Sequence, residues 1–219
     1  MATYLPVLTY LAGLSNFDRK WGLFIYRTTY DDQELWERYL AYVKTAIMHA
    51  IKPQSEPDLP SSWNPFTYEF PRRAKLQSRF ELLTKEDKKN LNGKSISEAR
   101  EEFRHWVATV PSEEKKGISR PRYNYFLYVD RDVLDRFQIV ETARGDREPD
   151  YVLEDVIAII VEADWEKDTL SDDDDDDVGK EWQFIQVHSI PRLYDSVIHD
   201  EDGWFRYFTR PPYIYGMTI

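Results

Sequence analysis

The sequence predicts an α/β fold, a sandwich of one sheet and the helices packed on it. Apolar and aromatic runs typical of buried strands alternate along the chain with apolar residues at helical spacing. The 219 residues, 42% of them hydrophobic, suffice for one buried core, so we expect a single domain over residues 1–219. A ferredoxin-like sheet with decorations fits the order of elements best, and a small doubly wound sheet is the alternative.

The first strand and the first helix carry the clearest signals. Residues 21–28 are aromatic and β-branched, which indicates a buried strand. Asp31 and Glu34 form a capping pair for a helix whose apolar residues recur at helical spacing as far as Ile51. Residues 52–71 hold five prolines, which end this helix and predict an extended connection within the domain.

The later elements continue the alternation of strands and helices. Ser95 and Glu98 have the spacing of a capping box at the start of the second helix. The apolar run at 156–161 indicates a strand buried on both faces. Strands are expected at 79–83, 122–129, 151–161 and 181–190, and helices at 95–110 and 131–137.

Acidic residues are concentrated in one stretch of a chain whose net charge is -11. Residues 162–177 hold ten acids and one base, and the last six are consecutive aspartates. These aspartates repel one another and bury nothing, which predicts a disordered acidic loop at 166–179. A calcium loop needs spaced ligands and a glycine turn, and the histidines share no ligand spacing, so we expect neither a metal nor a cofactor.

Basic residues gather in the segment 71–94, which carries eight bases against three acids. This is either a solvated surface or a local phosphate-binding face for an RNA. The residues we single out for RNA binding are Arg72, Arg73, Lys75, Lys85, Lys88 and Lys89.

The compartment signals favour a cytoplasmic protein. The apolar run at 156–161 is far shorter than the roughly 18 residues that span a bilayer. The N-terminus lacks the basic start of a secretory signal, and the chain has no Cys and therefore no disulfide. We expect no membrane segment.

Three predicted strands end in side chains that carry chemistry. If these ends lie together, as at the carboxyl edge of a parallel sheet, they form an acidic, aromatic pocket that suits a cationic ligand such as a guanidinium group. The candidate catalytic residues are Arg27, Thr28, Asp130 and Glu162. The candidate substrate-binding residues are Tyr26, Tyr30, Asp32, Trp36, Tyr128, Asp164 and Trp165.

Each of these side chains also has a structural interpretation. Asp32 and Asp130 stand where helix N-terminal residues are expected. Arg27, on an aromatic strand, either belongs to a ligand site or forms an ion pair within the fold, because a buried cation needs a partner. Thr28 or Thr29 could supply a hydroxyl nucleophile.

Three segments carry a resemblance to a known family. Residues 21–30 (WGLFIYRTTY) with Asp32 and Trp36, residues 121–123 leading to 128–130, and residues 162–165 resemble a widespread family of filamentous-fungal proteins. Through it the chain is similar to fungal arginine-containing cyclodipeptide synthases. The resemblance implies an enzyme that takes aminoacyl-tRNA as a partner, and it assigns no catalytic residue.

Three functions follow as alternatives. The first is an aminoacyl-tRNA-dependent transferase of fungal secondary metabolism that forms an arginine-containing cyclic dipeptide. The second is a non-catalytic protein-interaction module that uses the proline-rich segment and the aromatic tail at 203–219. The third is a small-molecule hydrolase or isomerase in which Asp130, Glu162 or Asp164 acts as general base, which predicts a pocket carboxylate with a raised pKa.

Overall fold

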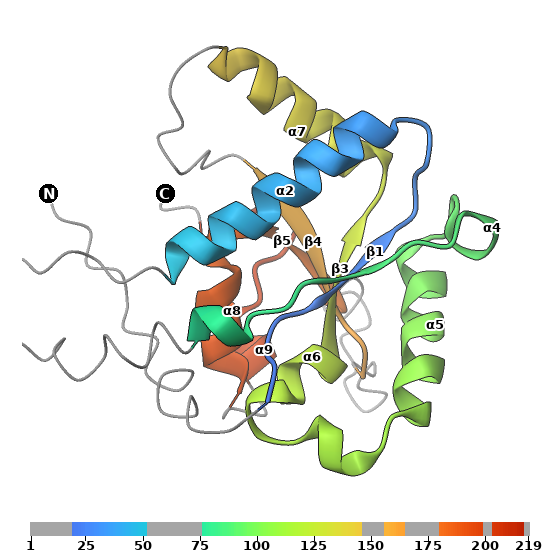
Figure 1. Ribbon diagram of the computed structural model, residues 1–219, viewed down its shortest axis with the longest axis vertical. Helices are drawn as coiled ribbons and strands as arrows, with labels where there is room; N and C mark the ends of the chain where they lie inside the picture. The colour runs from blue at the N-terminus through green and yellow to red at the C-terminus, as the bar shows by residue number, and fades with distance from the viewer. Residues whose placement is uncertain (1–18, 52–75, 146–155, 165–179, 199–202, 217–219) are drawn as a thin grey trace, which may run out of the picture.

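The computed structural model describes residues 19–51, 76–145, 156–164, 180–198 and 203–216, which form a mixed α/β protein around one six-stranded sheet (Figure 1). The strands are β1 (Phe24–Arg27), β2 (Leu83–Lys85), β3 (Tyr125–Val129), β4 (Ile157–Glu162), β5 (Trp182–Gln186) and β6 (Ile214–Tyr215). The α-helices are α2 (Gln33–Ala50), α4 (Lys88–Leu91), α5 (Ile96–Thr109), α6 (Arg120–Asn124), α7 (Arg131–Arg144), α8 (Ile190–Val197) and α9 (Gly203–Tyr207). Short 3-10 turns are η3 (Ser112–Lys115), η4 (Gly117–Ser119) and η5 (Val187–Ser189).

The sheet has the strand order β2-β1-β3-β4-β5-β6 and mixed strand directions. β1 is parallel to both β2 and β3, whereas β4 is antiparallel to β3 and to β5, and β6 is parallel to β5. The α/β class is confirmed. The sheet is not the antiparallel sheet of a ferredoxin-like fold, and only its β2-β1-β3 part has the parallel arrangement of a doubly wound sheet.

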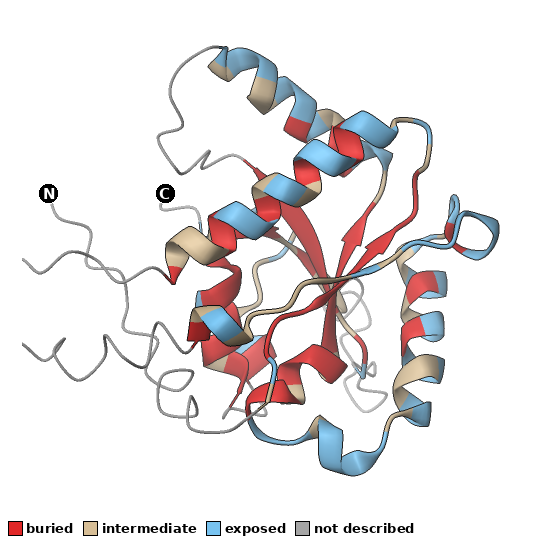
Figure 2. Ribbon diagram, viewed as in Figure 1, coloured by how far each residue is buried: buried red, intermediate tan, exposed pale blue. Residues whose placement is uncertain are grey.

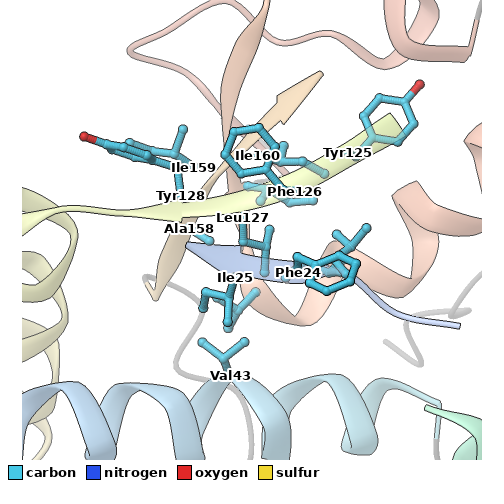
Figure 3. Packing of buried hydrophobic residues seen from close by; sticks show 14 of the residues in the cluster. Phe24, Ile25, Val43, Tyr125, Phe126, Leu127, Tyr128, Ala158, Ile159 and Ile160 are labelled. Atoms are coloured by element: carbon cyan, nitrogen blue, oxygen red, sulfur yellow. The ribbon is translucent and has the colours of Figure 1, made fainter. Parts of the chain in front are cut away.

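Helices cover both faces of this sheet (Figure 1). On one face, which we call the α2 face, Ile25 of β1 points toward Val43 of α2 (Figure 3). On the other, the α5 face, Phe126 of β3 stacks on Phe103 of α5 with ring centroids 4.8 Å apart. Figure 2 shows that β1, β3 and β4 are buried almost throughout and that the helices are buried on the side toward the sheet. Aliphatic and aromatic side chains on both faces therefore form the core.

The helix starts are set by side-chain caps. Asp32, one residue after the expected Asp31, caps α2 by accepting a hydrogen bond from Leu35 N. The predicted capping box of α5 is confirmed, since Ser95 and Glu98 bond each other's backbone N–H groups. α7 is longer than expected and runs to Arg144.

Several predicted strands have different limits. β3 begins only at Tyr125 and β5 ends at Gln186, because a proline in the first turn starts α6 before β3 and α8 soon after β5. The strand expected at 79–83 forms later, as β2 at 83–85. The proline-rich connection at 52–71, the acidic loop at 166–179 and the start of the strand expected at 151–161 lie outside the described residues.

Candidate functional site

The mixed strand directions place the predicted site residues at two opposite edges of the sheet. β1 and β3 are parallel, so Arg27, Thr28 and Asp130 follow them at one edge, which we call the Arg27 edge. β4 is antiparallel to β3, so Glu162 lies at the other edge, the Glu162 edge. The condition for one shared pocket is therefore not met, because only the first two strand ends lie together.

The guanidinium group of Arg27 is bound by the chain itself. Only 1% of Arg27 is exposed, and its carbon Cζ lies 4.5 Å from the ring centroid of Tyr30 and 5.0 Å from that of Trp36. Its Nε and Nη1 donate to Thr29 O at 2.7 Å, Gln33 Oε1 at 2.6 Å and Glu86 Oε2 at 3.1 Å. Arg27 thus forms an ion pair with Glu86 within the fold. Its acidic and aromatic surroundings are those that the sequence predicts for a cationic ligand.

Other predicted residues at the Arg27 edge bond neighbouring backbone. The hydroxyl groups of Thr28, Tyr30 and Tyr128 donate to Val129 O at 3.1 Å, Arg27 O at 3.0 Å and Lys94 O at 2.7 Å, respectively. Tyr26 packs between Phe103 and Phe126, and burial raises its pKa. These contacts hold β1, β3 and the turn before α5 together.

The two aspartates of this edge cap helices. Asp32 accepts from Leu35 N at 2.8 Å, and Asp130 accepts from Val133 N at 3.0 Å at the start of α7. Partial burial raises the pKa of Asp130, although the Val133 bond opposes this shift.

The predicted RNA-binding residues divide into three groups. Arg72, Arg73 and Lys75 lie outside the described residues. Lys85 packs its Nζ 4.7 Å from the ring centroid of Trp106, which is a contact within the fold. Lys88 and Lys89 are exposed on α4, which begins where β2 ends at the Arg27 edge.

Glu162 combines burial with few partners. Tyr125, its cross-strand partner on β3, donates to Oε1 at a long 3.5 Å. The other oxygen, Oε2, is buried and has no hydrogen-bond partner in the described part of the chain. Burial, with a smaller contribution from the charge of Asp164, raises the pKa of Glu162 to about 7, against the opposing effects of the Tyr125 bond and Arg100.

Trp204 of α9 contacts residues on both sides of the end of β4. Its ring stacks on Tyr125 with centroids 5.4 Å apart, and its Nε1 donates to Lys180 O at 2.8 Å. Tyr125 opens β3, and residue 180 precedes β5, so the two contacts flank the end of β4 on both sides. Trp204 therefore spans β4 at the level of Glu162 and keeps water from one side of its carboxyl group.

The other described residues of the Glu162 edge include both buried and exposed positions. Asp164 is exposed, and Trp165 lies outside the described residues. Arg100 of α5 donates from Nε to Ala163 O at 2.9 Å, which fixes the backbone between Glu162 and Asp164. A half-buried carboxyl group near the exposed Asp164 can exchange a proton with a molecule bound beside it.

Tyr125 and Trp204 belong to this site, although neither is among the residues predicted for it. Tyr125 falls inside a predicted strand, but the pairing that sets it beside Glu162 depends on the direction of β4. Trp204 lies more than 40 residues along the chain from Glu162, and only tertiary packing brings it to β4. No sequence signal marks either contact.

Two other surface features do not include Glu162. A groove of about 330 Å³ is lined by Arg19, Lys20, Glu113, Glu114, Ser119, Arg122 and Tyr123. The exposed large apolar side chains among the described residues are Ile139, Phe205 and Tyr213. Within the same ranges, no three His, Cys, Asp or Glu side chains are grouped as metal ligands would be.

Comparison of the chain with models of protein families, with curated proteins and with solved structures gives no match. None of the helices in the described ranges has the length and apolar character needed to cross a membrane.

Proposed function

We propose that this protein is an acid–base enzyme acting on a small molecule, with Glu162 as the group that accepts and returns the proton. The observation that carries the proposal is the half-buried carboxyl group of Glu162, whose Oε2 has no partner in the described ranges. The loss of water outweighs the opposing charge of Arg100, so the carboxyl group holds its proton up to about neutral pH. At that pH it can transfer the proton in either direction, as a hydrolase or an isomerase requires.

The surroundings of Glu162 favour this role over a structural one. Buried carboxylates that serve stability normally receive an ion pair or several hydrogen bonds. Glu162 receives one long bond from Tyr125, and the nearby negative charge of Asp164 works against its ionisation. Such an arrangement costs stability and suits catalysis.

Comparison of cell metabolites tests the proposal while the substrate is still unidentified. The wild type and Glu162→Gln are produced in the same host, and the small molecules are compared by untargeted mass spectrometry. We expect at least one metabolite to change with the wild type and its turnover to fall at least about 100-fold in Glu162→Gln. Glu162→Asp, which keeps a carboxyl group, should retain more of the activity.

The exposed Glu101 of α5 supplies the matched control. Glu101→Gln removes the same charge from the surface and should give the metabolites of the wild type. If Glu162→Gln produces the same change as the wild type, Glu162 is not the acid–base group and the proposal is wrong.

Transfer of an aminoacyl group from tRNA, with formation of an arginine-containing cyclic dipeptide, is the second function we propose. The observation that favours it is the exposed pair Lys88 and Lys89 on α4, beside the edge that carries Thr28 and Asp130. An amine that attacks an aminoacyl ester needs alignment and one proton acceptor. Asp130, whose pKa burial raises, is the acceptor available at this edge.

Binding of tRNA tests this second function. Lys88→Glu/Lys89→Glu should lower the affinity for aminoacyl-tRNA at least about tenfold in a filter-binding assay, because two phosphate contacts are reversed. Lys44→Glu, a reversal on the exposed side of α2, should leave the affinity close to that of the wild type. Equal affinities of wild type and double variant would remove the support that α4 gives to this function.

A further inference from the structure

The groove of about 330 Å³ lies between the residues that precede β1 and the segment from η3 to α6. Its volume is at the small end of the roughly 300–1,000 Å³ that sites for small molecules occupy. Three of its lining residues are exposed, which gives a dissolved molecule access: Lys20, Glu113 and Glu114. The groove therefore has both the space and the opening that a small ligand needs.

Hydrogen bonds between the two segments hold the groove in shape. Ser119 Oγ donates to Lys20 O at 2.9 Å. Arg19 Nη1 donates to Glu113 O and, at 3.2 Å, to Lys116 O, and so joins the start of the described chain to η3. Ser119 and Tyr123 are buried and form fixed parts of the lining. The site is thus formed before any ligand enters, as binding sites for small molecules usually are.

Two of the charged side chains in the groove are neutralised by the chain itself. Arg122 Nη1 forms an ion pair with Glu81 Oε2 at 3.1 Å. Glu113 Oε1 forms one with Lys116 Nζ at 2.8 Å. Within the described ranges, the charged side chains of the groove that make no ion pair are those of Arg19, Lys20 and Glu114.

The guanidinium group of Arg19 keeps one edge for a ligand. Its two bonds to backbone carbonyls both use Nη1. Nε and Nη2 point side by side from the other edge, and neither has a hydrogen bond to another described residue. A carboxylate accepts two parallel hydrogen bonds from such a pair of donors. Lys20 adds a second positive charge to the same groove.

Glu114 gives the groove a negative charge as well, and Tyr123 lies near both signs. Burial raises the pKa of Tyr123, so its hydroxyl group stays a neutral donor. The positive charge of Arg19 opposes this shift and the negative charge of Glu114 adds to it, which places both charges near this hydroxyl group. A phosphate would be repelled by Glu114, whereas an ammonium group would be attracted to it.

We propose that this groove binds a small zwitterion, a molecule in which a short chain joins one carboxylate to one ammonium group, as in an amino acid. The carboxylate binds Arg19 and Lys20, and the ammonium group binds Glu114. The inference goes beyond both functions proposed above, because the groove includes neither Glu162 nor the lysines of α4.

Titration of the full chain with probes of known charge spacing tests the proposal, with backbone amide signals followed by NMR at constant ionic strength. The zwitterions are glycine, β-alanine, 4-aminobutanoate and 6-aminohexanoate, and the singly charged probes are butanoate and butylamine. We expect saturable shifts at Ser119 and Tyr123 with at least one zwitterion, whose dissociation constant is at least about tenfold lower than those of both singly charged probes. If no zwitterion binds more tightly than both, the proposal is wrong.

Two exposed side chains allow the two charge contacts to be tested separately. Glu114→Gln should weaken binding of the best zwitterion at least about fivefold and should not weaken binding of butanoate. Lys20→Met should weaken binding of both. Because neither side chain forms an ion pair with another described residue, both variants should fold, and the same spectra show whether they do.

Matched changes at exposed positions outside the groove supply the controls. Glu101→Gln of α5 and Lys44→Met of α2 remove the same charges and should leave every dissociation constant close to that of the wild type. Equal affinity of the best zwitterion for the wild type and for Glu114→Gln would show that its ammonium group does not bind Glu114, which overturns the proposal. Since binding alone is measured, this result does not depend on either proposed function.

Discussion

At the scale of single residues, burial makes the stability of the protein depend on the ionisation of Glu162. Burial raises the pKa of this carboxyl group from its ordinary value of 4.5 to about 7. Between these two values the folded protein keeps a proton that the unfolded chain releases. Folding is therefore favoured by this group at low pH, and the contribution is lost as the pH rises through about 7.

Glu162→Gln should remove that dependence. Between about pH 5 and about pH 8, we expect the free energy of unfolding of the variant to fall by about 2 kcal/mol less than that of the wild type, after allowance for the part of the carboxyl group that faces solvent. Urea unfolding at the two pH values measures the difference. Glu101→Gln controls for the loss of a surface charge, and equal falls in wild type and Glu162→Gln would contradict the assignment.

Arg27 should behave as a stabilising residue of the core. Arg27→Met leaves Gln33, Glu86 and the carbonyl of Thr29 without their donor, so we expect a loss of about 3 kcal/mol in the free energy of unfolding. Arg38→Met, which breaks a more exposed pair with Glu141, should cost less than about 1 kcal/mol. Chemical denaturation measures the free energy of unfolding of the two variants. Similar small losses in both would contradict the stabilising role of Arg27.

At the scale of elements, the approach of the chain to β1 depends on one glycine. Gly22 has φ +116°, and a Cβ there would lie 2.3 Å from Glu81 O. Arg122 links the same two backbone segments, because its Nε donates to Gly22 O at 3.2 Å and its Nη2 donates to Glu81 O at 3.0 Å. The β1–β2 pair therefore begins where two backbones meet without room for a side chain.

Gly22→Ala should destabilise the protein by about 3 kcal/mol, because both the positive φ and the contact with Glu81 oppose a Cβ. Gly93→Ala is the matched control, since Gly93 also has a positive φ but has no heavy atom within 4 Å of the added Cβ. We expect Gly93→Ala to cost about 1 kcal/mol. Thermal unfolding of the two variants checks the order, and a smaller loss for Gly22→Ala would contradict the close approach.

Elements governed by local chemistry could be predicted from the sequence. The capping box at Ser95 marks the start of α5, and the apolar spacing of α2 matches residues that are buried. Prolines are harder to interpret. Pro121 and Pro191 begin helices in segments that also alternate like strands, and the pairing of β3 and β5 decides where each strand starts or ends.

At the scale of the whole molecule, the position of the site depends on strand direction, which no local pattern encodes. The sequence marks Glu162 and Asp130 equally well as polar residues after strands. Whether they share an edge depends on β4 returning antiparallel after α7, and this follows from packing between distant segments. The residues of the candidate site could thus be named in part, but their grouping could not.

Trp204, which lies near the C-terminal end of the chain, covers β4 beside Glu162. Trp204→Leu should open the cover over β4 and let water reach Glu162, so we expect the pKa of Glu162 to fall toward its ordinary value. A carbon-13 titration of the carboxyl group measures this shift. Phe205→Leu, a change at an exposed neighbour, should leave the titration as in the wild type, and a pKa that stays near 7 in Trp204→Leu would contradict the role of the cover.

The side chains around the guanidinium group of Arg27 could bind a small guanidinium compound in a variant that lacks Arg27. Arg27→Ala would turn the space between Tyr30, Trp36 and Glu86 into an empty receptor for a free guanidinium compound. Methylguanidinium at ten times its dissociation constant should then restore about 1.4 kcal/mol to the variant, and nothing to the wild type or to Arg27→Met. Calorimetric melting at increasing ligand concentration would detect this chemical rescue. In the natural chain, the side chain of Arg27 fills this space and is held there by its own backbone.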